Sequence, residues 1–205
     1  MFRSPKILHW LFPGRVWGIF VSNPIVYLTF DDGPDAEITP WLLDFLKEES
    51  IVATFFCVGT NIKNQPETYQ RILSDGHSVG NHLMNHENGY KTNDVVYLKS
   101  VEDASELIES NLFRPAYGKL KKSTERKLSN KYKIIMWSWL SYDYDKNVPI
   151  EKIIQKSKNI KQGDILVFHD NKKTKTRLKE ALPIVVEMLK KRGFRFESLN
   201  SGLMD

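Results

Sequence analysis

The chain has 205 residues, of which 41% are hydrophobic and 27% are charged, and its formal net charge is +5 at pH 7. This length and composition predict one globular domain, or at most two small ones, with a real hydrophobic core. Cys57 is the single cysteine, so an internal disulfide and a thiolate metal site are both excluded. Because Cys57 lies in the apolar run ATFFCVG, we expect a buried, inert thiol.

The positive charge would suit an anionic partner, since the isoelectric point is about 9.1. The basic runs 119–127 and 171–180, however, are typical of solvated helix faces or loops. No zinc-finger, RNA-binding or basic-zipper pattern accompanies them. We therefore expect no nucleic-acid partner.

Residues 1–24 contain basic residues and the short apolar run ILHWLF, which Pro13 ends. This run is too short to span a bilayer, and no small-residue cleavage site follows it, so it is a poor signal peptide. We expect residues 1–24 to pack on a domain formed by residues 25–205, with weak association to a membrane surface as the alternative. The expected location is the cytoplasm.

Along the rest of the chain, short runs with β-strand character alternate with helical patterns. The expected strands are 25–30, 53–58, 77–81, 112–114, 133–139, 164–169 and 194–199. The expected helices begin with Thr39 as N-cap and Pro40 as first residue, and then cover 65–76, 93–110, 149–158 and 175–192.

This alternation predicts right-handed crossovers and a mostly parallel sheet. About seven strand–helix units fit a closed or nearly closed barrel better than an open sheet. We therefore expect an α/β fold with a distorted or incomplete (β/α) barrel of about seven parallel strands. In such a barrel the chemistry lies at the C-terminal ends of the strands.

Polar residues that could carry chemistry do follow the apolar runs. They are Asp31 and Asp32 after the first run, His82 and His86 after the third, Arg114 at the end of the fourth, Asp143 after the fifth and His169 at the end of the sixth. Five separate segments would thus deliver acids, histidines and an arginine to the same rim.

The run HLMNH places His82 and His86 four residues apart, and on a helical turn both would lie on one face. Two imidazoles in that arrangement can bind one divalent cation, with Asp31 or Asp32 as a third ligand. Leu83 stands where the zinc-protease motif needs a glutamate, which disfavours that class. Non-haem iron could use the same ligand set, but the remaining residues suggest hydrolysis.

The adjacent acids Asp31 and Asp32 would repel each other without a cation nearby. One carboxylate would bind the metal, and the other would accept a proton from an attacking water. The turn at Gly33 and Pro34 would present both side chains.

Five runs occur in the order of the five motifs of a known family. They are TFDDGP (29–34), GHSVGNHLMNH (76–86), FRPAYG (113–118), WSWLSYDY (137–144) and ILVFHD (165–170). From about residue 25 to residue 199, the chain resembles the polysaccharide deacetylases, carbohydrate esterase family 4, which contain the NodB homology domain.

This resemblance implies a role for each matched residue on the metal side of the site. Asp31 would be the general base, paired with Arg114. Asp32, His82 and His86 would bind one divalent metal ion, with zinc favoured over cobalt or nickel.

On the other side, the resemblance implies that His169 is the general acid and that Asp143 pairs with it. Asp145 is a rival partner for His169, although Asp143 fits the register better. The backbone N–H of Tyr117 would help to stabilise the oxyanion.

Four residues depart from the family pattern without removing a metal ligand. They are Leu83, Ala116, Leu140 and Tyr144. The expected activity is metal-dependent hydrolysis that removes acetyl groups from N-acetylated amino sugars in a polysaccharide, an oligosaccharide or a glycan precursor. The alternatives are a cyclic-imide or ureide amidohydrolase on a related barrel, and a glycan-binding relative without catalysis. The sequence predicts neither the particular sugar nor the oligomeric state.

Overall fold

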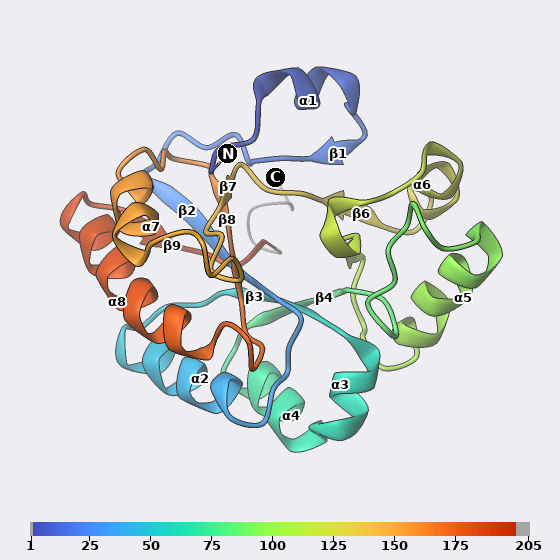
Figure 1. Ribbon diagram of the computed structural model, residues 1–205, viewed down its shortest axis with the longest axis horizontal. Helices are drawn as coiled ribbons and strands as arrows, with labels where there is room; N and C mark the ends of the chain where they lie inside the picture. The colour runs from blue at the N-terminus through green and yellow to red at the C-terminus, as the bar shows by residue number, and fades with distance from the viewer. Residues whose placement is uncertain (1, 200–205) are drawn as a thin grey trace.

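A computed structural model describes residues 2–199. The strands form one curled sheet in the order β1-β6-β5-β4-β3-β2-β8-β7, with β9 paired to β2, and every strand pairing is parallel (Figure 1). The expected α/β fold with a distorted, incomplete (β/α) barrel is confirmed.

The strands are β1 (Arg15–Val16), β2 (Ile25–Asp31), β3 (Thr54–Cys57), β4 (Ser78–Asn81), β5 (Leu112–Phe113), β6 (Lys133–Ile135), β7 (Trp139–Leu140), β8 (Ile165–His169) and β9 (Arg195–Phe196). The α-helices are α1 (Lys6–Leu11), α2 (Ile38–Glu48), α3 (Gly59–Asn64), α4 (Pro66–Ser74), α5 (Asp94–Ser105), α6 (Lys122–Leu128), α7 (Ile150–Ser157) and α8 (Lys175–Lys191), and residues Ala116–Gly118 form a 3₁₀ turn.

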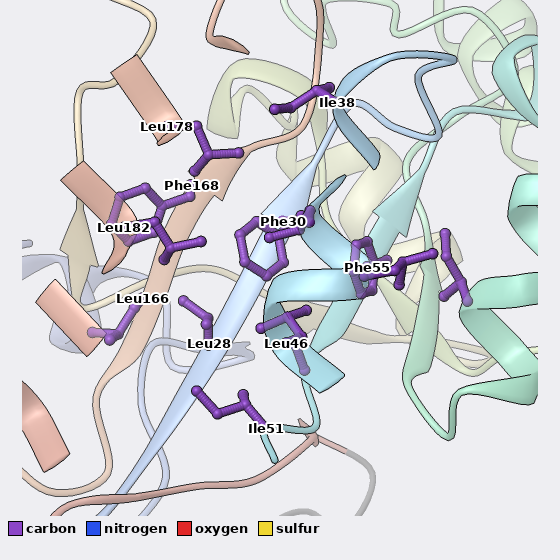
Figure 2. Packing of buried hydrophobic residues seen from close by; sticks show 14 of the residues in the cluster. Leu28, Phe30, Ile38, Leu46, Ile51, Phe55, Leu166, Phe168, Leu178 and Leu182 are labelled. Atoms are coloured by element: carbon purple, nitrogen blue, oxygen red, sulfur yellow. The ribbon is translucent and has the colours of Figure 1, made fainter. Parts of the chain in front are cut away.

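Strand β2 is the centre of the core, because all seven of its residues are buried. Its alternate side chains Leu28 and Phe30 face the layer of helices, where Leu46 of α2 and Leu182 of α8 cover them (Figure 2). Tyr27 points the other way and packs in the barrel interior. Fully burying a side chain of the size of Leu or Phe stabilises the fold by about 1.5–3 kcal/mol. The packing of β2 therefore fixes the position of its C-terminal end and of the residues that follow it.

The expected strand 133–139 is wrong as one element. Its first part, β6, pairs with β1 and β5, whereas its last part, β7, pairs with β8 at the other end of the sheet. Residues 136–138 bridge these two ends, with Met136 N–H donating to Val16 O at 2.7 Å and Ser138 N–H donating to Ile165 O at 3.2 Å. The barrel is therefore nearly closed by a connecting segment.

The first helix also differs from its expectation at the start. Helix α2 begins at Ile38, and Asp35 Oδ1 accepts from the N–H groups of Glu37 and Ile38 at 2.9 and 3.1 Å. Thr39 is therefore the second residue of the helix and not its cap. Its hydroxyl instead donates to Asp170 Oδ2 at 2.7 Å.

The N-terminal segment contributes β1 to the sheet and adds α1, which stands away from the body of the molecule at the top of Figure 1. Arg3 forms an ion pair with Asp164 at 2.7 Å, and the His9 ring stacks on Trp17. The division at residue 25 stays a prediction, and the last six residues of the expected domain lie outside the described ones. None of the helices within residues 2–199 has both the length and the apolar character needed to cross a bilayer.

Candidate active site

A pocket of about 710 Å³ lies at the C-terminal ends of the parallel strands. The sequence-predicted residues that line it are Asp31, Asp32, His82, His86, Tyr117 and His169. Arg114 and Asp143 lie behind this lining, fully buried. The structure thus brings together all eight residues that the sequence singled out.

Asp32, His82 and His86 form a cluster whose candidate ligand atoms all lie within 4.8 Å of one another. Asp32 Oδ1 lies 3.0 Å from His86 Nε2 and 3.6 Å from His82 Nε2. His82 Nδ1 lies 2.7 Å from the carbonyl oxygen of Arg114, so a proton on Nδ1 leaves Nε2 free to face the cluster. One carboxylate and two imidazoles, with room in the pocket for further ligands, fit a single divalent cation.

The two imidazoles do not converge through a helical turn, so that expectation is wrong. Residues 82–86 form a loop in which Leu83 and His86 have φ angles of 72° and 59°. Asn81 Oδ1 accepts from the Leu83 N–H at 2.9 Å and shapes the loop. Leu83 itself is fully buried in a core cluster, which explains why an apolar residue follows the first histidine.

Asp31 ends β2 and binds Arg114, whose Nη1 donates to Asp31 Oδ1 at 2.6 Å. The guanidinium also donates to the carbonyl oxygens of Ile135 and Met136 and lies 4.0 Å from the centre of the Phe56 ring. Burial lowers the pKa of Arg114 from its ordinary value, and the Asp31 carboxylate opposes this shift. Removing one partner of such a buried pair typically costs about 3–5 kcal/mol, because the other charge is then buried without a partner. The short hydrogen bond from Arg114 fixes the orientation of the Asp31 carboxylate.

His169 ends β8, and Asp143 binds it at two points. Asp143 Oδ1 lies 2.7 Å from His169 Nδ1, and Asp143 Oδ2 accepts from the His169 backbone N–H at 2.8 Å. Burial by itself lowers the pKa of His169, but the Asp143 carboxylate overcomes this and raises the pKa to about 9. The structure places Asp143 here, whereas Asp145 Oδ1 accepts from the Asn147 N–H.

Tyr117 lies in the 3₁₀ turn after β5 and has a φ of 59°. The residue is 61% exposed, and its ring meets the His86 ring edge-on, with 4.6 Å between centroids. Trp137, Leu140 and Val167 form an apolar part of the pocket wall. Trp139, two residues further along the chain, lies instead in the hydrophobic core.

Gly33 is required by a close approach of Asp170. A Cβ on Gly33 would lie 2.0 Å from Asp170 Oδ2, and Asp170 Oδ1 accepts from the Gly33 N–H at 3.1 Å. Burial raises the pKa of Asp170 well above its ordinary value. Sequence reasoning assigned Asp170 no role, although it directly follows His169. It joins the turn after β2 to the end of β8.

Sequence reasoning also missed the loop after β8. The run 171–180 was expected to be a solvated surface, but Asn171, Lys172 and Lys173 line the pocket. Asn171 Nδ2 donates to Asp32 Oδ2 at 2.7 Å, so the second oxygen of this carboxylate is occupied while Oδ1 faces the two histidines. Only the fifth motif pointed to this region, and it ends one residue earlier.

Replacing Asn171 by Ala should weaken divalent-metal binding by about tenfold, because Asp32 would lose the bond that fixes its orientation. Competition with a chromophoric chelator measures the Kd for Zn²⁺ directly. Lys175→Gln is the matched control, since that side chain lies outside the pocket lining and pairs with Glu37, and its Kd should equal that of the wild type. An unchanged Kd in Asn171→Ala would contradict this role of the amide.

The site can hold one cation and can exchange protons on two sides of it. A carboxylate lies on one flank and an imidazole of raised pKa on the other, which is typical of hydrolases that attack an acyl group with water. The fold and the site therefore define a metal-dependent hydrolase of the incomplete (β/α)-barrel class.

Comparison with known proteins agrees with this class. The profile of the polysaccharide deacetylase family matches residues 21–136. A peptidoglycan-N-acetylglucosamine deacetylase of Bacillus cereus is 32% identical over 195 residues, which cover 91% of this chain and 92% of the relative. The peptidoglycan-N-acetylglucosamine deacetylase PgdA of Listeria monocytogenes is 30% identical over 87% of this chain and 39% of its own length.

Among solved structures, that of the peptidoglycan N-acetylglucosamine deacetylase Bc1960 superposes with a TM-score of 0.89 at 29% identity, covering 98% of this chain and 97% of the other. The chitin deacetylase of the fungus Colletotrichum lindemuthianum gives a TM-score of 0.83 at 25% identity, over 93% and 92% of the two chains. The chain belongs to the polysaccharide deacetylase family. The expected family is thus confirmed, together with its class of activity, hydrolysis of carbon–nitrogen bonds in N-acetylated glycans.

Proposed function

We propose that this protein removes the acetyl group from N-acetylglucosamine residues of peptidoglycan or of its precursors, with zinc as the metal. The observation that carries this proposal is the meeting, in one pocket, of the Asp32–His82–His86 cluster with two opposed proton-transfer groups. The names of the relatives from Bacillus cereus and Listeria monocytogenes support the choice of sugar.

Asp32, His82 and His86 would hold the cation. When bound, a divalent cation there would polarise the amide carbonyl and lower the pKa of a nearby water. Two nitrogens and one oxygen are a common zinc set that leaves a position open, and cobalt or nickel can use the same donors. The Bc1960 complex contains an N-hydroxybenzamide, whose adjacent oxygens can chelate such an ion, which supports a metal site in the family.

Asp31 would act as the general base that accepts a proton from the attacking water. Its carboxylate lines the pocket beside Asp32 and is fixed by the Arg114 guanidinium at 2.6 Å. A base held in one orientation within reach of its proton is what general base catalysis requires. The backbone N–H of Tyr117 would donate to the oxyanion that forms as the carbonyl carbon becomes tetrahedral, an effect typically worth about 3–4 kcal/mol per donor.

His169 would act as the general acid. An amine leaves poorly as an anion, so a proton must reach the sugar nitrogen as the C–N bond breaks. With Nδ1 bound to Asp143, the proton available to the pocket is that on Nε2. The pKa of about 9 keeps this imidazole protonated at neutral pH.

Acetate release tests the proposal. The protein is incubated with N-acetylglucosamine oligomers and with peptidoglycan fragments, before and after chelation, and acetate is measured by an enzyme-coupled assay. We expect release that stops on chelation and returns with added Zn²⁺. Release that persists after the metal has been removed to below detection would contradict a metal-dependent mechanism.

The pH dependence of kcat should show a basic limb from His169. The protonated form is the active one, so kcat falls as pH rises through the pKa of His169, which the nearby carboxylates raise from its ordinary value of 6.5 to about 9. A cation on Asp32 offsets part of that carboxylate's effect and moves the limb below 9. In Asp143→Asn the limb should move to lower pH, because the pKa of His169 loses the largest contribution that raises it against burial, and only the smaller effects of Asp32 and Asp31 remain. A limb at the same pH in both proteins would contradict the assignment.

We also propose that the protein is located in the cytoplasm. It would make a soluble or lipid-linked precursor of peptidoglycan the substrate. Cell fractionation with immunodetection measures it, and recovery of the protein outside the cell would overturn it.

A further inference from the structure

The side chains of two lysines line the pocket without a hydrogen-bonded partner among residues 2–199. Lys172 and Lys173 are exposed and line the pocket that holds the candidate metal ligands. Within residues 2–199, neither ammonium group makes a hydrogen bond or an ion pair. Their neighbour Lys175, in contrast, lies outside the pocket lining and is paired with Glu37 at 2.5 Å.

The loop that carries these lysines is fixed to the site. Asn171 binds Asp32 through its amide nitrogen and accepts from the Lys173 N–H at 2.9 Å through its amide oxygen. The buried Thr174 hydroxyl donates to the carbonyl oxygen of His169 at 2.5 Å. The backbone that carries the two lysines is therefore already ordered. Binding of a ligand would cost little additional backbone entropy.

Three of the acids at the pocket face a positive group or the candidate cation site. Asp31 is paired with Arg114 and Asp143 with His169, while a divalent cation would more than balance Asp32. Asp35 is the remaining acid of the lining, and its Oδ1 accepts from two N–H groups at the start of α2. Asp35 offsets one positive charge, but Lys172, Lys173 and the excess charge of a divalent cation together outweigh it. The loaded pocket therefore stays positive, in a chain whose net charge is already +5.

We propose that Lys172 and Lys173 recognise a carboxylate on the glycan beside the N-acetylated sugar that is cleaved. This inference rests on the proposed function, and it deepens it by naming an acidic glycan as the preferred substrate. In peptidoglycan the neighbouring muramic acid carries a lactyl carboxyl group, which is either free or extended by a peptide with its own carboxylates. A chitin-type oligomer has no charged group at that place.

The test compares acetate release from a peptidoglycan fragment and from a neutral N-acetylglucosamine oligomer of equal length. For the double variant Lys172→Gln/Lys173→Gln, we expect kcat/KM to fall by about three- to tenfold on the acidic fragment, as two exposed ion pairs allow, and to stay within about twofold on the neutral oligomer. Raising NaCl from about 0.02 to about 0.5 M should remove most of the difference, because salt screens exposed charges.

Two controls make the result specific to charge at this loop. Lys175→Gln removes one positive charge two residues after Lys173 and should leave kcat/KM unchanged on both substrates. Lys172→Arg/Lys173→Arg retains the charge and should keep the preference. Equal losses on both substrates, no loss on either, or the same loss in Lys175→Gln would overturn the proposal.

A binding measurement separates this inference from the deacetylase proposal. Calorimetry of both glycans with Asp31→Asn, in the presence and absence of the lysine substitutions, reports recognition without turnover. Absence of acetate from both substrates with the wild-type protein would count against the proposed function alone. Equal Kd values for the acidic and neutral glycans would count against the lysines alone.

Discussion

Replacing Asp31 by Asn should lower acetate release by about 10²–10⁴-fold while metal binding survives. The asparagine side chain has nearly the same shape and can still accept from Arg114, but it cannot take a proton from water. Steady-state assays give the loss of kcat, and metal analysis after desalting gives the occupancy. Arg114 is buried and loses its countercharge, so thermal unfolding must show that the variant is folded at the assay temperature.

Asp32→Ala is the control for the other acid of the pair. Removing this carboxylate takes one of three candidate ligands from the cluster, so the expected result is loss of the metal and of activity together. The neighbouring acids are thus distinguished by metal content and not by activity, which falls in both variants. Equal metal occupancy in the two variants would reverse or void the assignment of their roles.

The fold was largely predictable, because its signals are local. The apolar runs at β2, β3 and β8 are each bounded by turn residues, and the helical patterns between them require a parallel sheet. Strands β1 and β7 have two residues each, which is too short for a hydrophobic period to be visible. The division of 133–139 depends on pairing partners at opposite ends of the sheet, and no local pattern encodes that.

The candidate site was predictable where a side chain directly follows a strand. Asp31 and His169 are the last residues of β2 and β8. They are register partners, so they lie side by side at the same edge of the sheet. The conformation of the His82–His86 loop was not predictable. Leu83 and His86 adopt left-handed backbone angles because of tertiary contacts, which no local sequence pattern shows. The bond from Asn171 to Asp32 joins residues 139 apart in sequence, so it is found only in three dimensions.

Replacing His169 by Gln should lower kcat on an N-acetylated sugar by about 10²–10⁴-fold with little change in metal affinity. Glutamine cannot donate a proton to the leaving nitrogen, whereas the three candidate metal ligands remain. Thermal unfolding and the Kd for Zn²⁺ report whether the site is otherwise intact. Asp143 keeps its bond to the backbone N–H of residue 169, which limits the cost of leaving this buried carboxylate without the imidazole.

The leaving group decides whether His169 acts as an acid or only shapes the pocket. A nitrophenyl acetate ester expels a phenolate that needs no proton, so the His169→Gln variant should lose no more than about tenfold on this ester. The Asp31→Asn variant should lose activity on amide and ester alike, since both reactions need the water to be deprotonated. A loss in His169→Gln that is as large for the ester as for the amide would mean that the imidazole is not the proton donor. The protonated imidazole would then serve only as the ion-pair partner of the buried Asp143 carboxylate.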